Sequence, residues 1–147
     1  MRKVQPLKTL LVICGGLIMS TFAISASAST EELVNPTLTD SLITSNTYEQ
    51  NILINNNWED ALSLKTTSSK STPVYRLYNP NTGQHYFTKD ASEKNGLVSR
   101  GWNYERIAFY SGGKKAIYVY YNPSNGAHFY GLPISGTVRQ GVAFYTN

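Results

Sequence analysis

Hydrophobic and polar residues alternate along several short segments of this 147-residue chain, most clearly in residues 73–88. A first strand is predicted for PVYRLY, because it contains β-branched and aromatic residues. A turn follows in NPNTG, which has the composition of a turn, and a second strand is predicted for QHYFT. The period then changes in residues 89–102, which predicts a short helix capped by Asp90 or Ser92. A third strand, YERIAFY, completes a ββαβ unit.

The same pattern recurs along the chain, which indicates internal repeats. YNPNTGQHYFT begins at Tyr78, YNPSNGAHFYG begins at Tyr121, and a more divergent copy, NPTLTDSLITSNTYEQNILINNNW, begins at Asn35. We predict three units of about 44 residues each: residues 30–73, 74–116 and 117–147. The first unit has lost the glycine and histidine of the hairpin, and the third has LPISGTV in place of the helix.

One such unit cannot bury its own apolar face, whereas three units can close on one another. The predicted fold is therefore mainly β with short helices (α+β), with three ββαβ repeats closed around a pseudo-threefold axis in a β-trefoil-like arrangement or a small barrel. Residues 29–147 are expected to form a single domain. The polar segment 66–72 is expected to connect the first two units.

Residues 1–28 have the three-part pattern of a secretory signal peptide. Three basic residues precede an apolar run, and the small residues ASA end at Ala28. We expect cleavage there and a secreted protein that could associate with the cell wall. No transmembrane segment is expected after cleavage; a membrane anchor is the alternative. The one cysteine, Cys14, lies in this segment. A secreted chain without disulfides fits a Gram-positive bacterium.

Charge is distributed unevenly along the chain, whose net charge is +4. Residues 31–60 contain six acidic and no basic residues, whereas residues 65–147 contain ten basic and three acidic ones. The later part could therefore meet an anionic partner such as teichoic acid, or the acidic part of its own chain. The basic residues are scattered and no recognition helix is evident, so no nucleic-acid partner is expected.

Tyrosines and histidines of the hairpins are the candidate ligand-binding residues. The chain has eleven tyrosines, and a tyrosine ring can stack on a sugar while its hydroxyl forms hydrogen bonds. The alternative is that about half of these rings fill the core. His85 and His128 could bind a ligand or serve the turns, but alone they make a poor metal set. We expect Trp58 and Trp102 in the core. The candidate ligand-binding set is Tyr75, Tyr78, His85, Tyr86, Tyr118, Tyr121, His128 and Tyr130.

No converging catalytic set is evident from the sequence. The acids after Asp60 are Asp90, Glu93 and Glu105, and Glu93 recurs as Glu49, which suits a role in a helix. We expect no enzymatic activity, no metal and no cofactor. A pair of carboxylates for glycoside hydrolysis stays open, because their separation is spatial.

The stretch VYRLYNPNTGQHYFT…SEKNGLVSRGWNYERIAFY resembles the domain of unknown function numbered 5648, found in secreted and wall-associated proteins of lactic acid bacteria and relatives. The resemblance covers residues 29–147 and is strong over residues 74–131; Arg106 stands where the family usually has glycine. It implies an extracellular accessory module. We therefore expect a secreted, non-catalytic module that attaches to a cell-wall polymer or glycan. The alternatives are a secreted protein-interaction or bacteriocin-like antagonist factor, and a decayed remnant.

Overall fold

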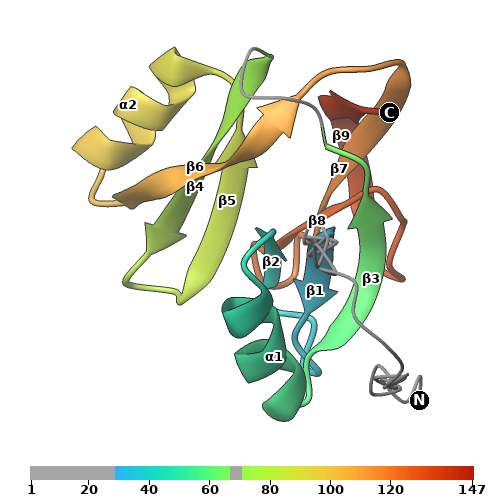
Figure 1. Ribbon diagram of the computed structural model, residues 1–147. Coiled ribbons are helices and arrows are strands. Elements are labelled where there is room, and N and C mark those ends of the chain that lie inside the picture. The colour runs from blue at the N-terminus through green and yellow to red at the C-terminus, as the bar shows by residue number, and fades with distance from the viewer. Residues whose placement is uncertain (1–28, 67–70) are drawn as a thin grey trace, which may run out of the picture.

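The computed structural model describes residues 29–66 and 71–147. They form nine strands and two helices, arranged as three antiparallel sheets of three strands each (Figure 1). This architecture confirms the prediction of a mainly β fold with short helices. The predicted signal segment, residues 1–28, lies outside the described residues, as do residues 67–70 of the predicted connection.

Each sheet has its first strand in the centre, its second strand on one side and its third strand on the other. The first sheet and its helix contain β1 (Thr30–Val34), β2 (Ser41–Thr44), α1 (Thr47–Asn55) and β3 (Glu59–Leu64). The second contains β4 (Thr72–Asn79), β5 (Gln84–Thr88), α2 (Ala91–Ser99) and β6 (Asn103–Ser111). The third contains β7 (Lys115–Tyr121), β8 (His128–Tyr130) and β9 (Val138–Thr146).

Turn and cap residues explain where these elements begin and end. Gly83 adopts φ 75° in the β4–β5 turn, a conformation that favours glycine. Of the two predicted caps of α2, Asp90 and Ser92, the structure has Asp90, whose carboxylate accepts two backbone N–H groups of the first turn. Gly101, with φ 96°, follows the helix. The first hairpin has no glycine, yet it still forms, with Leu38 at φ 53° in its turn.

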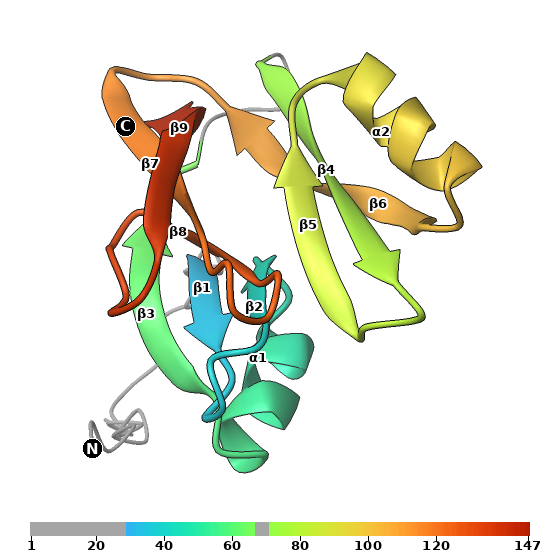
Figure 2. The ribbon, with the colours of Figure 1, turned by 180° about the vertical axis from the view of Figure 1, so that it is seen from behind.

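The three sheets share one hydrophobic core. Its buried residues come from all three sheets: Ile43, Leu64, Val74, Phe87, Phe109, Ile117, Tyr130 and Phe144. In Figure 2 the sheet of β4, β5 and β6, with α2 on its outer side, lies beside the other two sheets. The structure does not support β-trefoil closure, because the strands of different units belong to separate sheets. The shared core joins the units through side chains instead.

The first and third sheets are also joined by polar contacts. Ser41 Oγ donates to the carbonyl of His128 at 3.0 Å, and the backbone N–H of Tyr130 donates to Glu32 Oε1 at 2.7 Å. Each of the three sheets therefore touches both of the others. Across residues 29–66 and 71–147, no helix has the length and apolar character needed to span a membrane.

Candidate functional site

The strand registers identify corresponding positions in the three sheets. In each sheet, one residue of the central strand lies opposite the core residue of the second strand; the pairs are Glu32 with Ile43, Arg76 with Phe87, and Val119 with Tyr130. The central-strand residue of each pair is thus an acid in the first sheet, a base in the second and an apolar residue in the third. This difference makes the junctions between the sheets chemically unlike one another.

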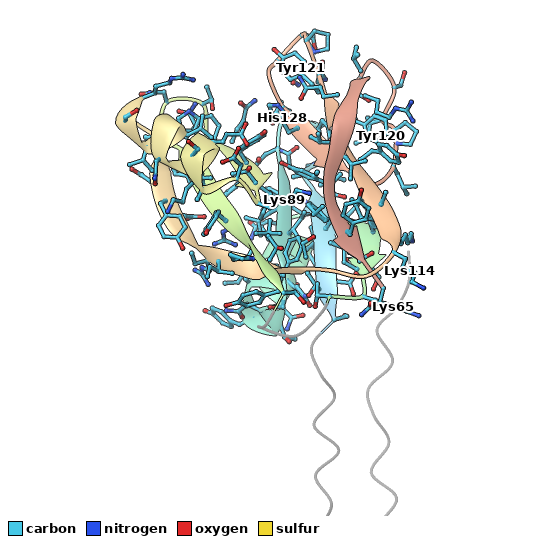
Figure 3. All side chains as sticks on the ribbon, turned by 90° about the horizontal axis from the view of Figure 1, so that it is seen from above. Lys65, Lys89, Lys114, Tyr120, Tyr121 and His128 are labelled. Atoms are coloured by element: carbon cyan, nitrogen blue, oxygen red, sulfur yellow. The ribbon has the colours of Figure 1, made fainter. Side chains whose placement is uncertain are left out.

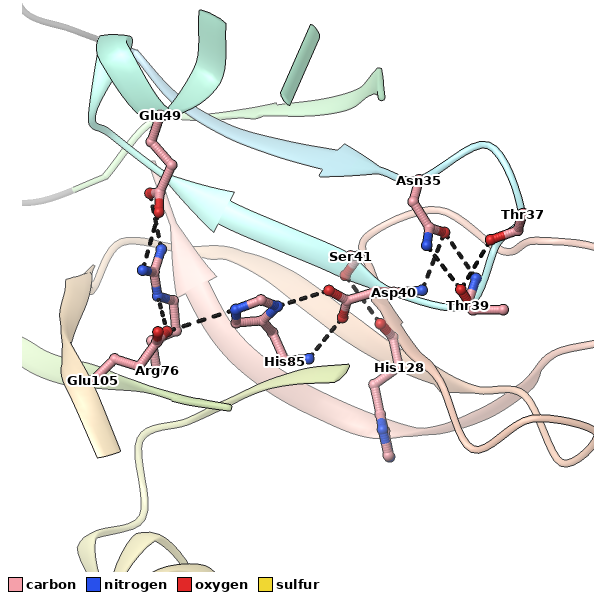
Figure 4. A network of polar contacts seen from close by, with 10 residues as sticks. All are labelled: Asn35, Thr37, Thr39, Asp40, Ser41, Glu49, Arg76, His85, Glu105 and His128. Carbon is pink, nitrogen blue, oxygen red and sulfur yellow. Dashed lines mark hydrogen bonds and ion pairs between the residues drawn. The ribbon is translucent and has the colours of Figure 1, made fainter. Parts of the chain in front are cut away.

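The junction between the first and second sheets is built on a buried arginine (Figure 4). The guanidinium of Arg76 donates to both carboxylate oxygens of Glu49, at 2.9 and 3.1 Å, and through Nε to Glu105 at 2.6 Å. The Arg76 side chain is only 3% exposed, and these carboxylates compensate the cost of burying its charge. Burial alone would raise the pKa of Glu49, but hydrogen bonds from Arg76 and Thr44, together with the charges of Arg76 and Arg106, lower that pKa.

His85 belongs to the same junction. Its Nδ1 lies 2.7 Å from Asp40 Oδ2, and its backbone N–H donates to Asp40 Oδ1 at 2.7 Å. Its Nε2 lies 3.6 Å from Glu105 Oε2, and the side chain is 13% exposed. Because both ring nitrogens face carboxylates of the protein itself, the geometry favours the structural alternative for His85.

The junction between the second and third sheets contains a hollow of about 300 Å³. The residues that line it are Tyr86, Glu93, Leu97, Trp102, His128 and Gln140. The ring of Tyr86 lies edge-on to those of Trp102 and His128, with centroid distances of 6.3 and 4.9 Å. The structure therefore brings together Tyr86 and His128, two members of the predicted set that come from different units.

Glu93 is the acidic residue of this hollow, and its carboxylate accepts a hydrogen bond from the Tyr86 hydroxyl at 3.1 Å. In the described part of the chain, Glu93 forms no ion pair with a lysine or arginine. It does not close a capping box either, because the backbone N–H of Asp90 donates to Thr88 Oγ1. Burial and the nearby Glu93 charge raise the pKa of Tyr86, which keeps its hydroxyl protonated.

His128 lies in the hollow in surroundings that favour the neutral imidazole. Burial lowers its pKa, and the attraction of Glu93 offsets this only in part. Its ring also lies 5.1 Å from that of Tyr121, next to which it appears in Figure 3. Tyr121 thus supports a wall residue of the hollow without lining the hollow itself.

The other predicted tyrosines lie outside the hollow. Tyr130 is a core residue: it is 1% exposed, and its hydroxyl accepts a hydrogen bond from the backbone N–H of Phe87 at 3.0 Å. Its prediction as a ligand-binding residue is wrong, because a ligand cannot reach a ring buried between sheets. Tyr78 packs against His85, with ring centroids 5.2 Å apart.

Tyr75 and Tyr118 are half-buried and lie next to cations of the protein. Lys94 Nζ lies 4.8 Å from the ring centre of Tyr75, and the guanidinium of Arg139 lies 4.9 Å from that of Tyr118. These cation–π contacts occupy one face of each ring. The two tyrosines therefore form separate surface contacts and do not extend the hollow.

The tryptophans were predicted to be core residues, and both are only half-buried. Trp102 lines the hollow described above, and Trp58 lines a larger one of about 750 Å³ beside α1. Sequence reasoning therefore missed Trp102 and Glu93 as site residues. Their recurrence as Trp58 and Glu49 is the signal in the sequence that could identify them.

Metal binding finds no support at these junctions. In residues 29–66 and 71–147, no group of three histidine, cysteine or acidic side chains is arranged to hold a metal ion. The side chains that line the hollow offer stacking on aromatic rings, hydrogen bonding and attraction to one carboxylate.

Comparisons with known proteins identify a family. No curated protein and no solved structure matches the chain. Residues 30–146 match the family described as a domain of unknown function, DUF5648. This match spans all nine strands and both helices of the described structure. The chain therefore belongs to the DUF5648 family.

Proposed function

We propose that this protein is a secreted, non-catalytic module that binds a glycan of the cell wall, and that the hollow between the second and third sheets is its binding site. The observation that carries the proposal is the composition of that hollow. It combines the rings of Tyr86 and Trp102 with the carboxylate of Glu93 and the amide of Gln140. Aromatic rings stack on the apolar faces of sugars, while carboxylates and amides bond their hydroxyls.

The use of the carboxylates supports binding without catalysis. Of the three acids that follow Asp60, Asp90 caps α2 and Glu105 pairs with Arg76. Glu93 remains as the single carboxylate of the hollow. Glycoside hydrolysis ordinarily needs a pair of carboxyl groups on either side of the scissile bond. A hollow with one carboxylate is better suited to holding a sugar than to cleaving it.

A location at the cell wall is supported by the sequence. Residues 1–28 have the pattern of a secretory signal, and the excess of basic residues after residue 65 suits a wall rich in anionic polymer such as teichoic acid. Sugar recognition in the hollow and long-range attraction to the polymer could act together. The first would determine specificity, and the second would raise the local concentration of protein at the wall.

Retention on purified Gram-positive cell walls, with and without teichoic acid, tests the proposal. The decisive variant is Tyr86→Leu, because Leu42 occupies the corresponding position in the first sheet and shows that the fold accepts leucine there. We expect about a tenfold weaker retention, since losing one stacked ring costs about 1.4 kcal/mol. Tyr48→Ala, on α1 and 74% exposed, is the control and should bind like the parent.

Two results would contradict this proposal. The first is a folded parent protein that is retained on neither kind of wall. The second is a Tyr86→Leu variant that is retained as well as the parent. If retention were lost only on the walls that lack teichoic acid, binding would be assigned to the anionic polymer and not to the hollow.

A protein-interaction factor is the second candidate function, and the hollow beside α1 favours it. Three acids, Glu31, Glu59 and Asp60, line that hollow together with Ile54 and Trp58. An apolar surface edged by acids suits a basic segment of a partner protein. Inhibition of related strains by the purified protein, lost in a Glu59→Gln, Asp60→Asn variant and unaffected by Tyr86→Leu, would favour this function.

A further inference from the structure

Two junctions of the molecule are built from corresponding positions but hold different residues. The strand registers, their bulges and the helix caps give the correspondence. The matching residues at the first and second junctions are Glu49 and Glu93 on the helices, Arg76 and Val119 on the central strands, Glu105 and Gln140 at the bulges, and His85 and His128 on the second strands. Comparing the two junctions shows what the second one lacks.

At the first junction, the chain itself supplies a cation to the helix carboxylate. Arg76 forms a two-pronged pair with Glu49 and a third charged hydrogen bond with Glu105. Charge-assisted pairs of this kind are the strongest hydrogen bonds that side chains form. The helix carboxylate at this position is therefore placed to receive a cation that lies between two sheets.

At the second junction, the carboxylate is kept and the cation is missing. Val119 replaces the arginine, and Gln140 replaces the second acid. Glu93 is left with the Tyr86 hydroxyl as its hydrogen-bond partner among the described residues. The hollow of about 300 Å³ opens beside it, with aromatic rings for walls.

The lysines near Glu93 in the sequence are not paired with its carboxylate. Lys94, which follows Glu93 directly, places its Nζ over the rings of Tyr75 and Tyr104, at 4.8 and 5.0 Å. Lys89 places its Nζ over Tyr145, at 5.3 Å. Both cations are thus engaged with rings outside the hollow, and the charge of Glu93 stays available to a ligand.

We propose that the hollow selects a glycan that carries a protonated amino group, such as an amino sugar without its acetyl group. The ammonium group would take the place at Glu93 that the guanidinium of Arg76 takes at Glu49. The faces and edges of Tyr86 and Trp102 would hold the sugar ring beside it, and a cation near such rings gains further attraction. This inference rests on the proposed glycan-binding function and adds the chemical class of the sugar.

The test compares two probes that differ only in the acetyl group. Short oligomers of glucosamine and of N-acetylglucosamine, with the same linkage and length, are titrated into the protein by calorimetry at about pH 6, where amines are protonated. We expect the parent to bind the glucosamine oligomer about tenfold more tightly, the range for one charge-assisted contact. Raising the salt concentration should reduce this preference.

Glu93→Gln is the decisive variant, because glutamine keeps an oxygen for the Tyr86 hydroxyl and removes only the charge. It should lose the preference for the amino oligomer and bind both oligomers alike. Tyr48→Lys makes the same change of net charge at an exposed position of α1 that lines neither hollow, and it should keep the preference. This control separates recognition in the hollow from general attraction of a cationic oligomer.

Each remaining outcome counts against the proposal. If the parent binds both oligomers equally, or Glu93→Gln keeps the preference, the selectivity is refuted while glycan binding stands. If the parent binds neither oligomer, the proposed function for these sugars and the inference built on it both fail.

Discussion

Replacing Glu32 with glutamine should make the protein more stable at neutral pH. Glu32 lies in β1 and is 1% exposed; its Oε1 accepts the backbone N–H of Tyr130, and its Oε2 has no hydrogen-bond partner among the described residues. Burial raises its pKa from 4.5 to about 8, although the backbone N–H of Tyr130 and the nearby Ser41 hydroxyl oppose the shift. In neutral solution the carboxyl group is therefore protonated in the folded protein and ionised in the unfolded chain.

The size of the effect follows from this difference in proton binding. Between pH 4.5 and 8 the folded state holds a proton that the unfolded state releases, so the free energy of unfolding falls by about 1.4 kcal/mol per pH unit. The stabilisation is complete below pH 4.5 and is lost as the pH rises through 8. At about pH 7 the loss reaches about 3 kcal/mol. Glutamine avoids this loss but buries an extra N–H at about 1 kcal/mol, which leaves a gain of about 2 kcal/mol.

Urea denaturation of the parent and of Glu32→Gln, over a series of pH values, measures this gain. Glu49 and His128 also affect the pH dependence, but with the opposite sign. Their pKa values are lowered in the fold, so their contributions to stability are lost as the pH falls. Both groups are present in both proteins, and the difference between the two curves isolates Glu32.

The difference between the curves should grow steadily as the pH rises from 4.5 to 8. A difference that stays constant across this interval would show that Glu32 does not change its proton binding on folding. A variant that is less stable than the parent at neutral pH would show that the carboxylate, not the carboxylic acid, is the form that the fold holds. Either result would refute the reasoning from burial.

Three further substitutions test other parts of the fold by the same denaturation assay. Arg76→Met should cost about 2–3 kcal/mol, because it leaves the carboxylates of Glu49 and Glu105 together without their cation; a neutral result would mean that this network contributes nothing net. Tyr130→Phe should cost about 1–2 kcal/mol by leaving a buried backbone N–H unpaired, and should leave wall retention unchanged. Gly96→Ala should add about 0.5–1 kcal/mol, because Gly96 lies within α2 and a Cβ there meets no atom within 4 Å; destabilisation would contradict the open surroundings of that helix.

Local sequence signals predicted the elements well, because they act over a few residues. The turn around Gly83 and the cap at Asp90, one of two caps predicted, both depend on neighbours in the chain, and both form. The joining of the units could not be predicted in this way. Arg76 finds its carboxylate partners 27 and 29 residues away in sequence, and alternation along β4 gives no hint of either.

The candidate site was predicted in part for a related reason. The hairpin pattern identified Tyr86 and His128, but not that a hollow forms where the second unit meets the third. Tyr130 shows the reverse error. It occupies the position of Ile43 and Phe87, two apolar residues, and that correspondence favours the core over a ligand site. Comparing units position by position was therefore more informative than counting aromatic residues.

The contacts of each sheet with both of the others limit how this architecture can change. A solenoid of stacked repeats has two free ends, so it can gain or lose a unit and adjust only its caps. Here the third sheet bonds back to the first through Ser41 and Glu32, so neither the first nor the last unit is a terminal one. Deleting or duplicating one unit would disrupt two junctions at once. The three sheets thus depend on one another, whereas a substitution at a single position such as Arg76 perturbs one junction only.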